Sequence, residues 1–368
     1  MYYGNNRLRS ITRNLDMPLI ALTLIAAIFG IIMISSAGTT SQVVIQSVSL
    51  ILGICGIVAL MILDYEYLAN ISLYLYGVAV FLLLLVLIPG IGSMINGARS
   101  WFSIGPVSIQ PAEFVKIIFI ITFSNHLSKV QDNINKPSVL LKLLGHLGIL
   151  CALILLQPDF GTATVFVFIA IVMLFVAGLS WKYIAGGAIA LGAFLPLAWF
   201  FLLKDYQKNR ILTLFNPESD PMGAGYHVIQ SKIAVGSGRF LGAGLGQGSS
   251  QVNNLLPERH TDFIFSVVCE ELGLIGAIAV LLILTFIILR CIYIGMNARN
   301  DLGNYICMGV STMLIFQVFE NIGMCIGLFP VTGITLPFFS YGGSSLLTTM
   351  LAIGLVLNVR YRCRLINF

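Results

Sequence analysis

Charged residues are scarce in this chain of 368 residues: Asp, Glu, Lys and Arg make up 10% of it, whereas 58% of its positions are hydrophobic. A soluble domain carries about 25% charged residues, because its surface must be hydrated. This scarcity of charge excludes a cytosolic globular enzyme, a disordered chain and a nucleic-acid-binding protein. The formal net charge of +5 is read first as a signal of membrane topology rather than as a binding surface.

Candidate metal ligands and nucleophiles are also few. The seven cysteines form no CxxC pair and their number is odd, so buried thiols are expected rather than a disulfide framework. The four histidines are scattered and no HExxH motif is present, so no metal site is expected. A Walker loop is absent, and the run GAGLGQGSS follows no predicted strand, which argues against a nucleotide site.

Long apolar runs are abundant in the chain. A helix that crosses a bilayer needs about 20 apolar residues, because its backbone amides must be satisfied within the helix. The runs predict one integral membrane domain over residues 1–368, an all-α polytopic fold with about ten transmembrane helices. The predicted helices are 17–36, 43–63, 71–89, 111–128, 139–156, 160–178, 184–203, 263–289, 305–328 and 344–360.

The distribution of basic residues predicts the orientation. With both termini in the cytoplasm, most basic residues of the tails and short loops lie inside, as the positive-inside rule requires. The exception is the large outer loop 204–262, which holds Lys204, Lys208, Arg210, Lys232, Arg239 and Arg259. A loop of this length is uncommon unless it is functional or disordered, and its segment 228–235 is expected to form an amphipathic helix on the membrane surface.

Two other outer loops have compositions that suit irregular backbone. Residues 90–110 are rich in glycine and suit a re-entrant interfacial segment, with Arg99 as the one strong cation of that loop. Residues 330–345, PVTGITLPFFSYGGSS, hold two prolines and three glycines. Such backbone is tolerated at membrane depth when it is buried in protein or lines an aqueous cavity. The pattern leaves both readings of this loop open, a structural plug and a cavity wall.

Ionisable side chains within the apolar runs are costly and are therefore candidates for function. Glu113 and Lys116 share a helix face near the outer end of one run. They can hold helices together as an ion pair, line an outward-facing cavity, or do both. Asp159, at an outer turn, is either a solvated loop residue or part of the same cavity. The remaining members of this set are Glu270, Glu271 and Glu320. Helix packing with polar partners explains these three as well as chemistry does.

The sharpest constellation is LPERHTDFIFSVVCEELG at residues 256–273, where the large outer loop becomes a predicted helix. Asp262 lies there at the expected membrane–water boundary, so partial desolvation can raise its pKa toward a value useful for a general base. Arg259 and His260 precede it and would complement an anionic ligand. An N-cap role explains Asp262 alone equally well.

Taken together, these stretches resemble the SEDS family (shape, elongation, division and sporulation) of bacterial membrane proteins, over nearly the whole chain. The resemblance is carried by GARSWFSIGPVSIQPAEFVK, LQPDFGTA, NPESDPMGAGYHVIQSKIAVGSG, LPERHTDFIFSVVCEELG and NIGMCIGLFPVTGITLPFFSYGGSS. The forms PVTGITLP and DPMGAGYHVIQS are more similar to the elongation branch, RodA, than to the division branch, FtsW.

The resemblance implies a peptidoglycan glycosyltransferase that polymerises lipid II on the outer face of the bacterial cytoplasmic membrane. Its implied partners are a class B penicillin-binding protein, which crosslinks the strands, and the elongation machinery. The essential aspartate of the family falls on Asp262, which would activate the 4-hydroxyl of the acceptor while undecaprenyl pyrophosphate leaves. The cavity residues of the family fall on Glu113, Lys116 and Asp159. Further substrate-binding residues are expected at Arg99, Arg210, Gln230, Ser231, Arg259 and His260.

The sequence does not decide which cation would stabilise the leaving diphosphate. Arg210, Arg259, Lys116 and a divalent cation such as Mg²⁺ or Mn²⁺ are the candidates. Two other functions also compete with the transferase. A lipid II flippase would share ten spans with intramembrane charges, but it should need charged groups on both sides of its path. A non-catalytic scaffold for a penicillin-binding protein would not explain Asp262 and the charged pair together.

Overall fold

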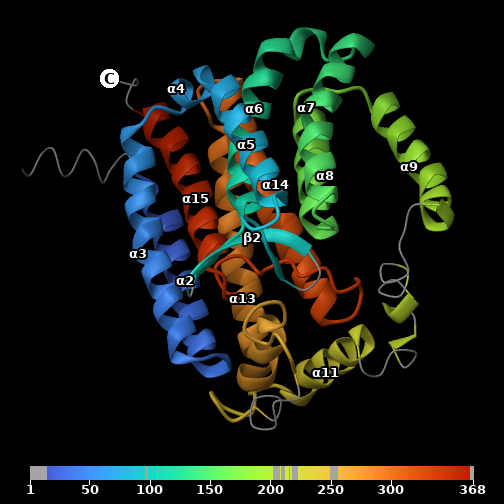
Figure 1. The fold of residues 1–368 in the computed structure, drawn as a ribbon. Coiled ribbons are helices and arrows are strands. Elements are labelled where there is room, and N and C mark those ends of the chain that lie inside the picture. Colours follow the sequence, from blue (N-terminus) through green and yellow to red (C-terminus); the bar gives the residue numbers. More distant parts are fainter. Residues whose placement is uncertain are drawn as a thin grey trace, which may run out of the picture.

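The computed structural model describes residues 15–95, 98–105, 107–201, 208, 212–214, 216–217, 223–248 and 256–364. Over these residues the chain is a bundle of helices with one small sheet at its side (Figure 1). The helices are α2 (Met17–Ala37), α3 (Thr40–Ile62), α4 (Tyr65–Asn70), α5 (Ser72–Leu87), α6 (Pro111–Val130), η1 (Gln131–Asn133), α7 (Pro137–Leu155), α8 (Phe160–Val176), α9 (Trp181–Phe201), α11 (Ala224–Ser237), α13 (Ile264–Met296), α14 (Asp301–Cys325) and α15 (Gly343–Arg364).

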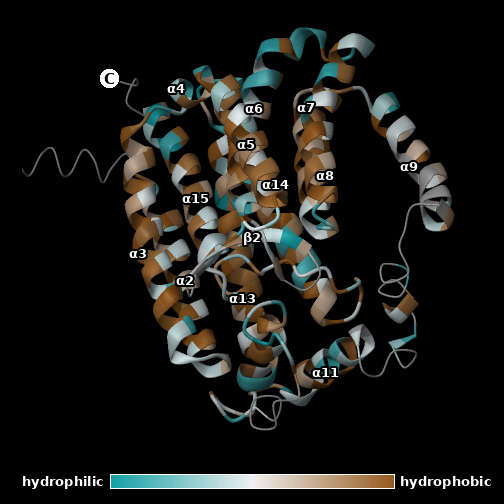
Figure 2. Cartoon of the chain, viewed as in Figure 1, coloured by the Kyte–Doolittle hydropathy of each residue, from teal (hydrophilic) through white to brown (hydrophobic). Residues whose placement is uncertain are grey.

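A helix lies at each of the ten apolar ranges, and the all-α membrane fold class is confirmed. Among the described residues, α2, α3, α7, α13, α14 and α15 are long and apolar enough to cross a membrane, and α5 and α8 are shorter apolar helices. Large side chains such as Ile51, Phe81 and Phe286 stand exposed on the outer faces, where hydrophobic surface dominates (Figure 2). Lipid is the solvent that suits such a surface, so this is a multi-pass membrane protein. The number of ten spans and the cytoplasmic termini stay predictions.

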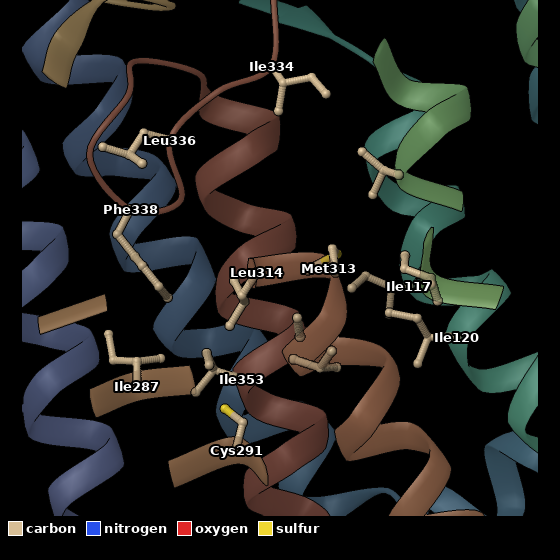
Figure 3. Packing of buried hydrophobic residues seen from close by; sticks show 14 of the residues in the cluster. Ile117, Ile120, Ile287, Cys291, Met313, Leu314, Ile334, Leu336, Phe338 and Ile353 are labelled. Atoms are coloured by element: carbon tan, nitrogen blue, oxygen red, sulfur yellow. The ribbon is translucent and has the colours of Figure 1, made fainter. Parts of the chain in front are cut away.

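The core lies around α14, which packs against α6, α8, α11, α13 and α15. Figure 3 shows Ile117 and Ile120 pointing toward Met313 and Leu314, with Ile353 on the other side. Lipid tails are as apolar as these side chains, so close packing and buried hydrogen bonds stabilise the contact between helices more than water exclusion does.

Helix α13 is broken at Gly273, whose backbone angles (φ 64°, ψ −159°) lie outside the helical region. The loop after α11 enters the break and pairs with the backbone groups that the break exposes. The Ala243 N–H donates to the Glu270 carbonyl, and the Leu274 N–H donates to the Arg239 carbonyl, each at 2.9 Å. This pairing is why a break can persist inside an apolar helix.

The two neighbouring glutamates of α13 lie at this break and are buried. The Ser36 hydroxyl of α2 donates to the Glu271 carboxylate, at 2.6 Å from Oε1. A methyl group on Gly248 would lie 2.8 Å from Glu270 Oε2, so the loop passes directly over that carboxylate. These contacts favour the packing reading of both glutamates.

The described residues between 90 and 110 include a small sheet, which differs from the expected re-entrant segment. Strands β1 (Ser93–Ile95), β2 (Ala98–Ile104) and β3 (Val107–Ile109) pair antiparallel in that order, with Met94 opposite Arg99. The sheet contacts α5, α6 and α15 (Figure 1). Strand pairing satisfies the backbone of a glycine-rich segment that a helix could not accommodate.

The expected helix within the large outer loop is confirmed over its segment 228–235, which lies in α11. Its most buried side chains are Val228, Ser231 and Ala234, and α11 packs against α13 and α14. Ile233, expected on the apolar stripe, is 54% exposed. The helix therefore docks on the bundle through a face that the apolar residues alone did not indicate.

Candidate active site

Asp262 lies in a turn that precedes α13. The N-cap residue of α13 is Phe263, so Asp262 lies one residue before the position that the N-cap alternative assigns to it. The Asp262 side chain is half-buried, and its Oδ2 lies 3.6 Å from the position that a methyl group on Gly333 would take. Gly333 itself has φ +78°, which favours glycine at this place beside the carboxylate. Asp262 is thus a half-buried acid against the last outer loop.

A single amide of α14 holds Asp262 and that loop together. Asn321 Nδ2 donates to the carbonyl oxygens of Asp262 and Ile334, each at 2.8 Å. Asn321 is fully buried, so water does not compete for these bonds, and each contributes about 1 kcal/mol. The position of Asp262 is therefore set from α14 as well as from its own helix.

Two further bonds join the last outer loop to the turn that carries Asp262, and a third joins the loop to α3. The Ser340 hydroxyl donates to the Thr261 carbonyl (2.6 Å), and the Tyr341 N–H donates to the His260 carbonyl (2.8 Å). Gln46 of α3, which is fully buried, donates to the Ser340 carbonyl at 3.0 Å. Sequence reasoning missed Gln46 and Ser340. A buried amide in an apolar run was the available signal for Gln46.

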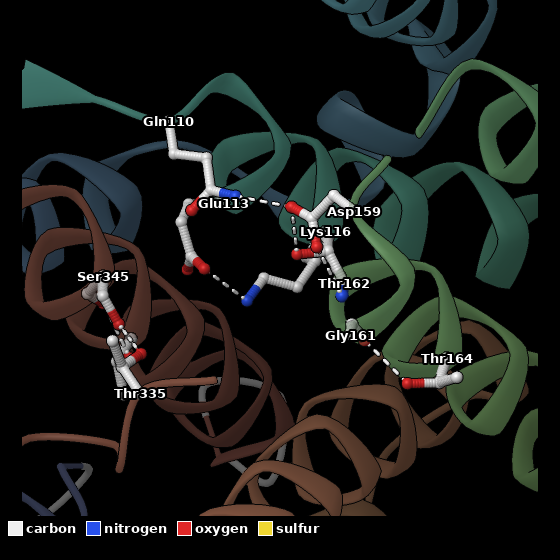
Figure 4. Close-up of polar contacts among 10 residues, drawn as sticks. Gln110, Glu113, Lys116, Asp159, Gly161, Thr162, Thr164, Thr335 and Ser345 are labelled. Atoms are coloured by element: carbon white, nitrogen blue, oxygen red, sulfur yellow. Dashed lines mark hydrogen bonds and ion pairs between the residues drawn. The ribbon is translucent and has the colours of Figure 1, made fainter. Parts of the chain in front are cut away.

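The second part of the site is a cluster of Glu113, Lys116 and Asp159, here named the Lys116 cluster (Figure 4). Lys116 Nζ donates to Glu113 Oε1 at 2.8 Å, and both side chains are buried. Asp159 caps α8 by accepting from the Thr162 N–H (3.0 Å) and hydroxyl (2.8 Å), and it also accepts from Gln110 Nε2 (2.8 Å). Asp159 is thus a half-buried helix cap, and these bonds favour its place in the cluster over a solvated loop residue.

The charges of the Lys116 cluster act on one another. Burial raises the pKa of Asp159, while hydrogen bonds from Thr162 and the positive charge of Lys116 oppose that rise. Glu320 of α14 lies within electrostatic range of Asp159 and beside Thr332. Glu320 Oε2 is buried without a hydrogen bond of good geometry to any described residue. This region therefore holds more carboxylates than cations and retains hydrogen-bonding capacity.

The segment 332–334 joins the two parts of the site. A methyl group on Gly161, in the first turn of α8, would lie 3.1 Å from the Thr332 carbonyl oxygen. One residue further along, Gly333 lies against Asp262. The last outer loop therefore contacts both the first turn of α8, next to Asp159, and Asp262, while its role as a structural plug or as a cavity wall stays a prediction.

Ser231 is a correction to the predicted site. Its hydroxyl donates to the Cys325 carbonyl (2.7 Å) and shares a hydrogen bond with the Ser266 hydroxyl (2.7 Å), and the residue is fully buried. It fastens α11 to α13 and α14, and its burial within the bundle keeps it from a substrate. The neighbouring Gln230 is half-buried, and its predicted role stays a prediction.

The predicted cations are dispersed. Arg259 Nε donates to the Ala37 carbonyl at the end of α2 (2.8 Å), where a cation suits the negative end of the helix. Arg99 lies half-buried on β2, and within the described part of the chain its Nε makes no hydrogen bond. Arg210 lies outside the described residues. A substrate role for these three arginines stays a prediction.

His260 differs from its expected role as a cation. Burial lowers its pKa from the ordinary 6.5, with Glu258 acting in the opposite direction and Arg259 in the same one. Its ring lies 5.5 Å from that of Tyr341. A histidine with a lowered pKa is mostly neutral at pH 7, so His260 can offer a hydrogen bond to a ligand but little positive charge.

Within the ranges that the structure describes, no three His, Cys, Asp or Glu side chains gather closely enough to hold a metal ion. The nearest grouping of acids, around Lys116, contains that lysine as its cation. The residues present therefore do not form a protein cage for Mg²⁺ or Mn²⁺.

Comparison with known proteins places this geometry in a family. The family model FTSW_RODA_SPOVE, described as "Cell cycle protein", matches residues 16–365. The chain is 38% identical over 301 residues to "Peptidoglycan glycosyltransferase MrdB" of Escherichia coli (strain K12), which covers 80% of this chain and 79% of that protein. It is 41% identical over 361 residues to "Stage V sporulation protein E" of Bacillus subtilis (strain 168), which covers 94% and 96%.

A solved structure agrees with these relatives. A chain described under "Structural coordination of polymerization and crosslinking by a peptidoglycan synthase complex" superposes with a TM-score of 0.84 at 33% identity, over 95% of this chain and 98% of that chain. The match extends over nearly the whole length of both chains. This chain belongs to the FtsW/RodA/SpoVE family, which is the SEDS family that its motifs resemble.

Proposed function

We propose that this chain polymerises lipid II into glycan strands, with Asp262 as the general base. Membership of the family and the names of several relatives make it a peptidoglycan glycosyltransferase. The observation that carries the role of Asp262 is its placement. It is an acid that lies half-buried beside Gly333 and is anchored through its backbone by Asn321.

In the proposed reaction, the Asp262 carboxylate takes the proton of the acceptor 4-hydroxyl. The oxygen attacks the anomeric carbon of the donor, the bond from that carbon to the diphosphate oxygen breaks, and undecaprenyl pyrophosphate leaves with inversion. A base of this kind accelerates such a step about 10²–10⁴-fold.

The developing negative charge of the leaving group needs a partner, and Lys116 is the best supported one. Its ammonium is buried and makes one hydrogen bond among the described residues, to Glu113, although it has three N–H groups. A cation in such a water-poor region acts more strongly than one in solvent. The described residues do not form a set of metal ligands, and the proposed steps involve no metal ion.

We further infer an elongation role on the outer face of the cytoplasmic membrane, beside a class B penicillin-binding protein. The partner is supported by the similar chain from a synthase complex that coordinates polymerization and crosslinking. The elongation branch is supported by the PVTGITLP and DPMGAGYHVIQS segments. Relatives named for sporulation and for FtsW match at comparable identity, so this assignment rests on those motifs.

The test is polymerisation of labelled lipid II by the purified chain with its penicillin-binding partner. The wild-type complex is expected to make long strands, and Asp262→Ala and Asp262→Asn to lose at least 100-fold of that rate. Both variants should keep the wild-type melting temperature and partner binding. Asp132→Asn, an exposed acid on η1, is the matched control and should keep full activity.

Undiminished polymer from Asp262→Asn would remove the general-base assignment. A wild-type complex that makes no polymer but moves lipid II across vesicle membranes would favour the flippase. A complex that does neither, yet binds and activates the penicillin-binding protein, would favour the scaffold.

A further inference from the structure

A cavity of about 250 Å³ lies between α5, α6 and α7, at the other end of α6 from the Lys116 cluster. Its lining includes Leu73 and Tyr76 of α5, His126 and Lys129 of α6, and His146 of α7. Lys129 is 13 residues beyond Lys116 on one helix, which separates their backbones by about 20 Å. The cavity is therefore distinct from the proposed active site.

The polar groups of this cavity bond to one another. His126 Nδ1 and His146 Nδ1 lie 3.2 Å apart, and His146 Nε2 lies 3.1 Å from the Thr122 hydroxyl. Asn125 Nδ2 donates to the Ser72 hydroxyl at 2.6 Å. Because these groups are paired within the wall, the surface that remains for a ligand is mostly hydrocarbon.

The charges at the cavity are positive. The two charged groups that act on His126 are Lys142 and Lys129, and both lysines are exposed. Lys129 follows His126 by three residues on α6, and Lys142 precedes His146 by four residues on α7, so each lysine shares a helix face with a cavity histidine. A hydrocarbon cavity with two cations at its edge complements a ligand that has an apolar chain and an anionic head.

We propose that this cavity binds one anionic phospholipid, with an acyl chain along the α5–α6–α7 wall and the phosphate at Lys129 and Lys142. The occupant is a membrane lipid because Leu73, on the cavity wall, is 79% exposed on a helix that faces the bilayer. Basic pockets between membrane helices bind anionic headgroups by the same physics. The site lies in the leaflet opposite Asp262, and its existence does not depend on which reaction Asp262 performs.

The experiment uses the full chain in nanodiscs of 80% phosphatidylcholine and 20% phosphatidylglycerol, released into detergent and weighed by native mass spectrometry. The wild type is expected to retain one phosphatidylglycerol in preference to phosphatidylcholine. In Lys129→Gln/Lys142→Gln the preference should fall about 25-fold, since each lysine near a lipid surface contributes about fivefold. Lys136→Gln/Lys182→Gln removes the same charge from two other exposed lysines and should keep the preference.

A second variant distinguishes the contribution of the lipid acyl chain from that of the phosphate headgroup. Leu73→Trp fills the cavity from an exposed position, so it should reduce retention of both lipids without changing their ratio. An unchanged preference in Lys129→Gln/Lys142→Gln would overturn the proposal. An equal loss of the phosphatidylglycerol preference in Lys136→Gln/Lys182→Gln would also overturn the proposal. Release of the lipid by millimolar inorganic phosphate alone would overturn it as well. Melting temperatures in detergent confirm that each variant is folded.

Discussion

Two charge clusters at different ends of the bundle differ in the balance of their charges. In the first, here named the Asp16 cluster, Arg290 donates to the Asp16 carboxylate from Nε and Nη2, both at 2.8 Å. Arg360 lies 3.8 Å away, and Asp16 also accepts from the Leu19 N–H and so caps α2. One carboxylate here has two cations and a helix end as partners.

In the Lys116 cluster the balance is reversed. One ammonium stands among Glu113, Asp159 and the nearby Glu320, and one carboxylate oxygen of Glu320 makes no hydrogen bond of good geometry to a described residue. The Asp16 cluster therefore has an excess of cations, whereas the Lys116 cluster has an excess of carboxylates. The proposal that the Lys116 cluster binds ligand and the Asp16 cluster serves stability is tested by the variants below.

The largest expected effect is on stability, at Asp16. Asp16→Ala leaves Arg290 and Arg360 without their anion and removes the cap of α2, so the free energy of unfolding should fall by about 3–5 kcal/mol. Unfolding in detergent, followed by circular dichroism, measures this. Polymerisation per folded molecule should stay unchanged. Asp64→Ala is the comparison variant, because it removes a partly exposed pair with Arg362 and the cap of the short helix α4, and it should cost less, about 1–2 kcal/mol.

The next effect is on activity, at Lys116. Lys116→Met removes the cation that we assign to the leaving diphosphate, so the polymerisation rate should fall about 10²–10³-fold. The single variant also leaves Glu113 buried without its partner and should lose stability. Glu113→Gln/Lys116→Met replaces the ion pair by neutral groups of similar size, which should restore stability but not activity. Recovery of activity in the double variant would reduce the cluster to a structural ion pair.

A smaller effect is expected at Asn321, which links the site to the bundle. Asn321→Leu removes the amide bonds to the Asp262 and Ile334 carbonyls, leaving the Asp262 carbonyl with the weak Cys325 thiol donor, and should cost about 2–3 kcal/mol of unfolding free energy. Polymerisation should fall about 10–100-fold, because the base is less firmly positioned. Asn304→Leu on the same helix, where the amide oxygen already lacks a hydrogen bond, should change neither quantity much. A full rate in Asn321→Leu would show that Asp262 needs no such anchor.

The smallest effect is a pH dependence that originates at His260. Its pKa is lowered in the folded chain, so below about pH 6.5 the unfolded chain binds more protons than the folded one. Stability should therefore fall as the pH falls, by less than about 1.4 kcal/mol per pH unit because the ring is only half-buried. Melting temperatures between pH 7.5 and 5.5 measure this. A slope that His260→Asn leaves unaltered would have another origin.

Much of the fold and part of the site were predictable. Each helix lies where an apolar run is long enough to satisfy its own backbone, which is a local property. Glu113, Lys116 and Asp159 were found because ionisable groups are rare in such runs. Ser231 was misassigned because the sequence shows an amphipathic helix but not which face the bundle covers.

Other features needed partners from distant parts of the chain. Gln46 and Ser340 are neutral polar residues whose importance becomes visible only when their hydrogen bonds to each other and to Thr261 are known. The sheet of residues 93–109 depends on pairing between strands, which a glycine-rich composition does not reveal. The break at Gly273 depends on the loop that enters it, and a glycine within an apolar run does not by itself indicate a helix break.

By itself, the sequence determined that this is a membrane protein of apolar helices, and which few charged residues merit attention. Tertiary structure alone decided which of those residues meet. It brought residues 113–116, 159 and 320 together, and it placed segment 332–334 between them and Asp262. The physical reason is that a run of apolar residues determines a helix locally, whereas a buried polar group must find its partner wherever packing brings one.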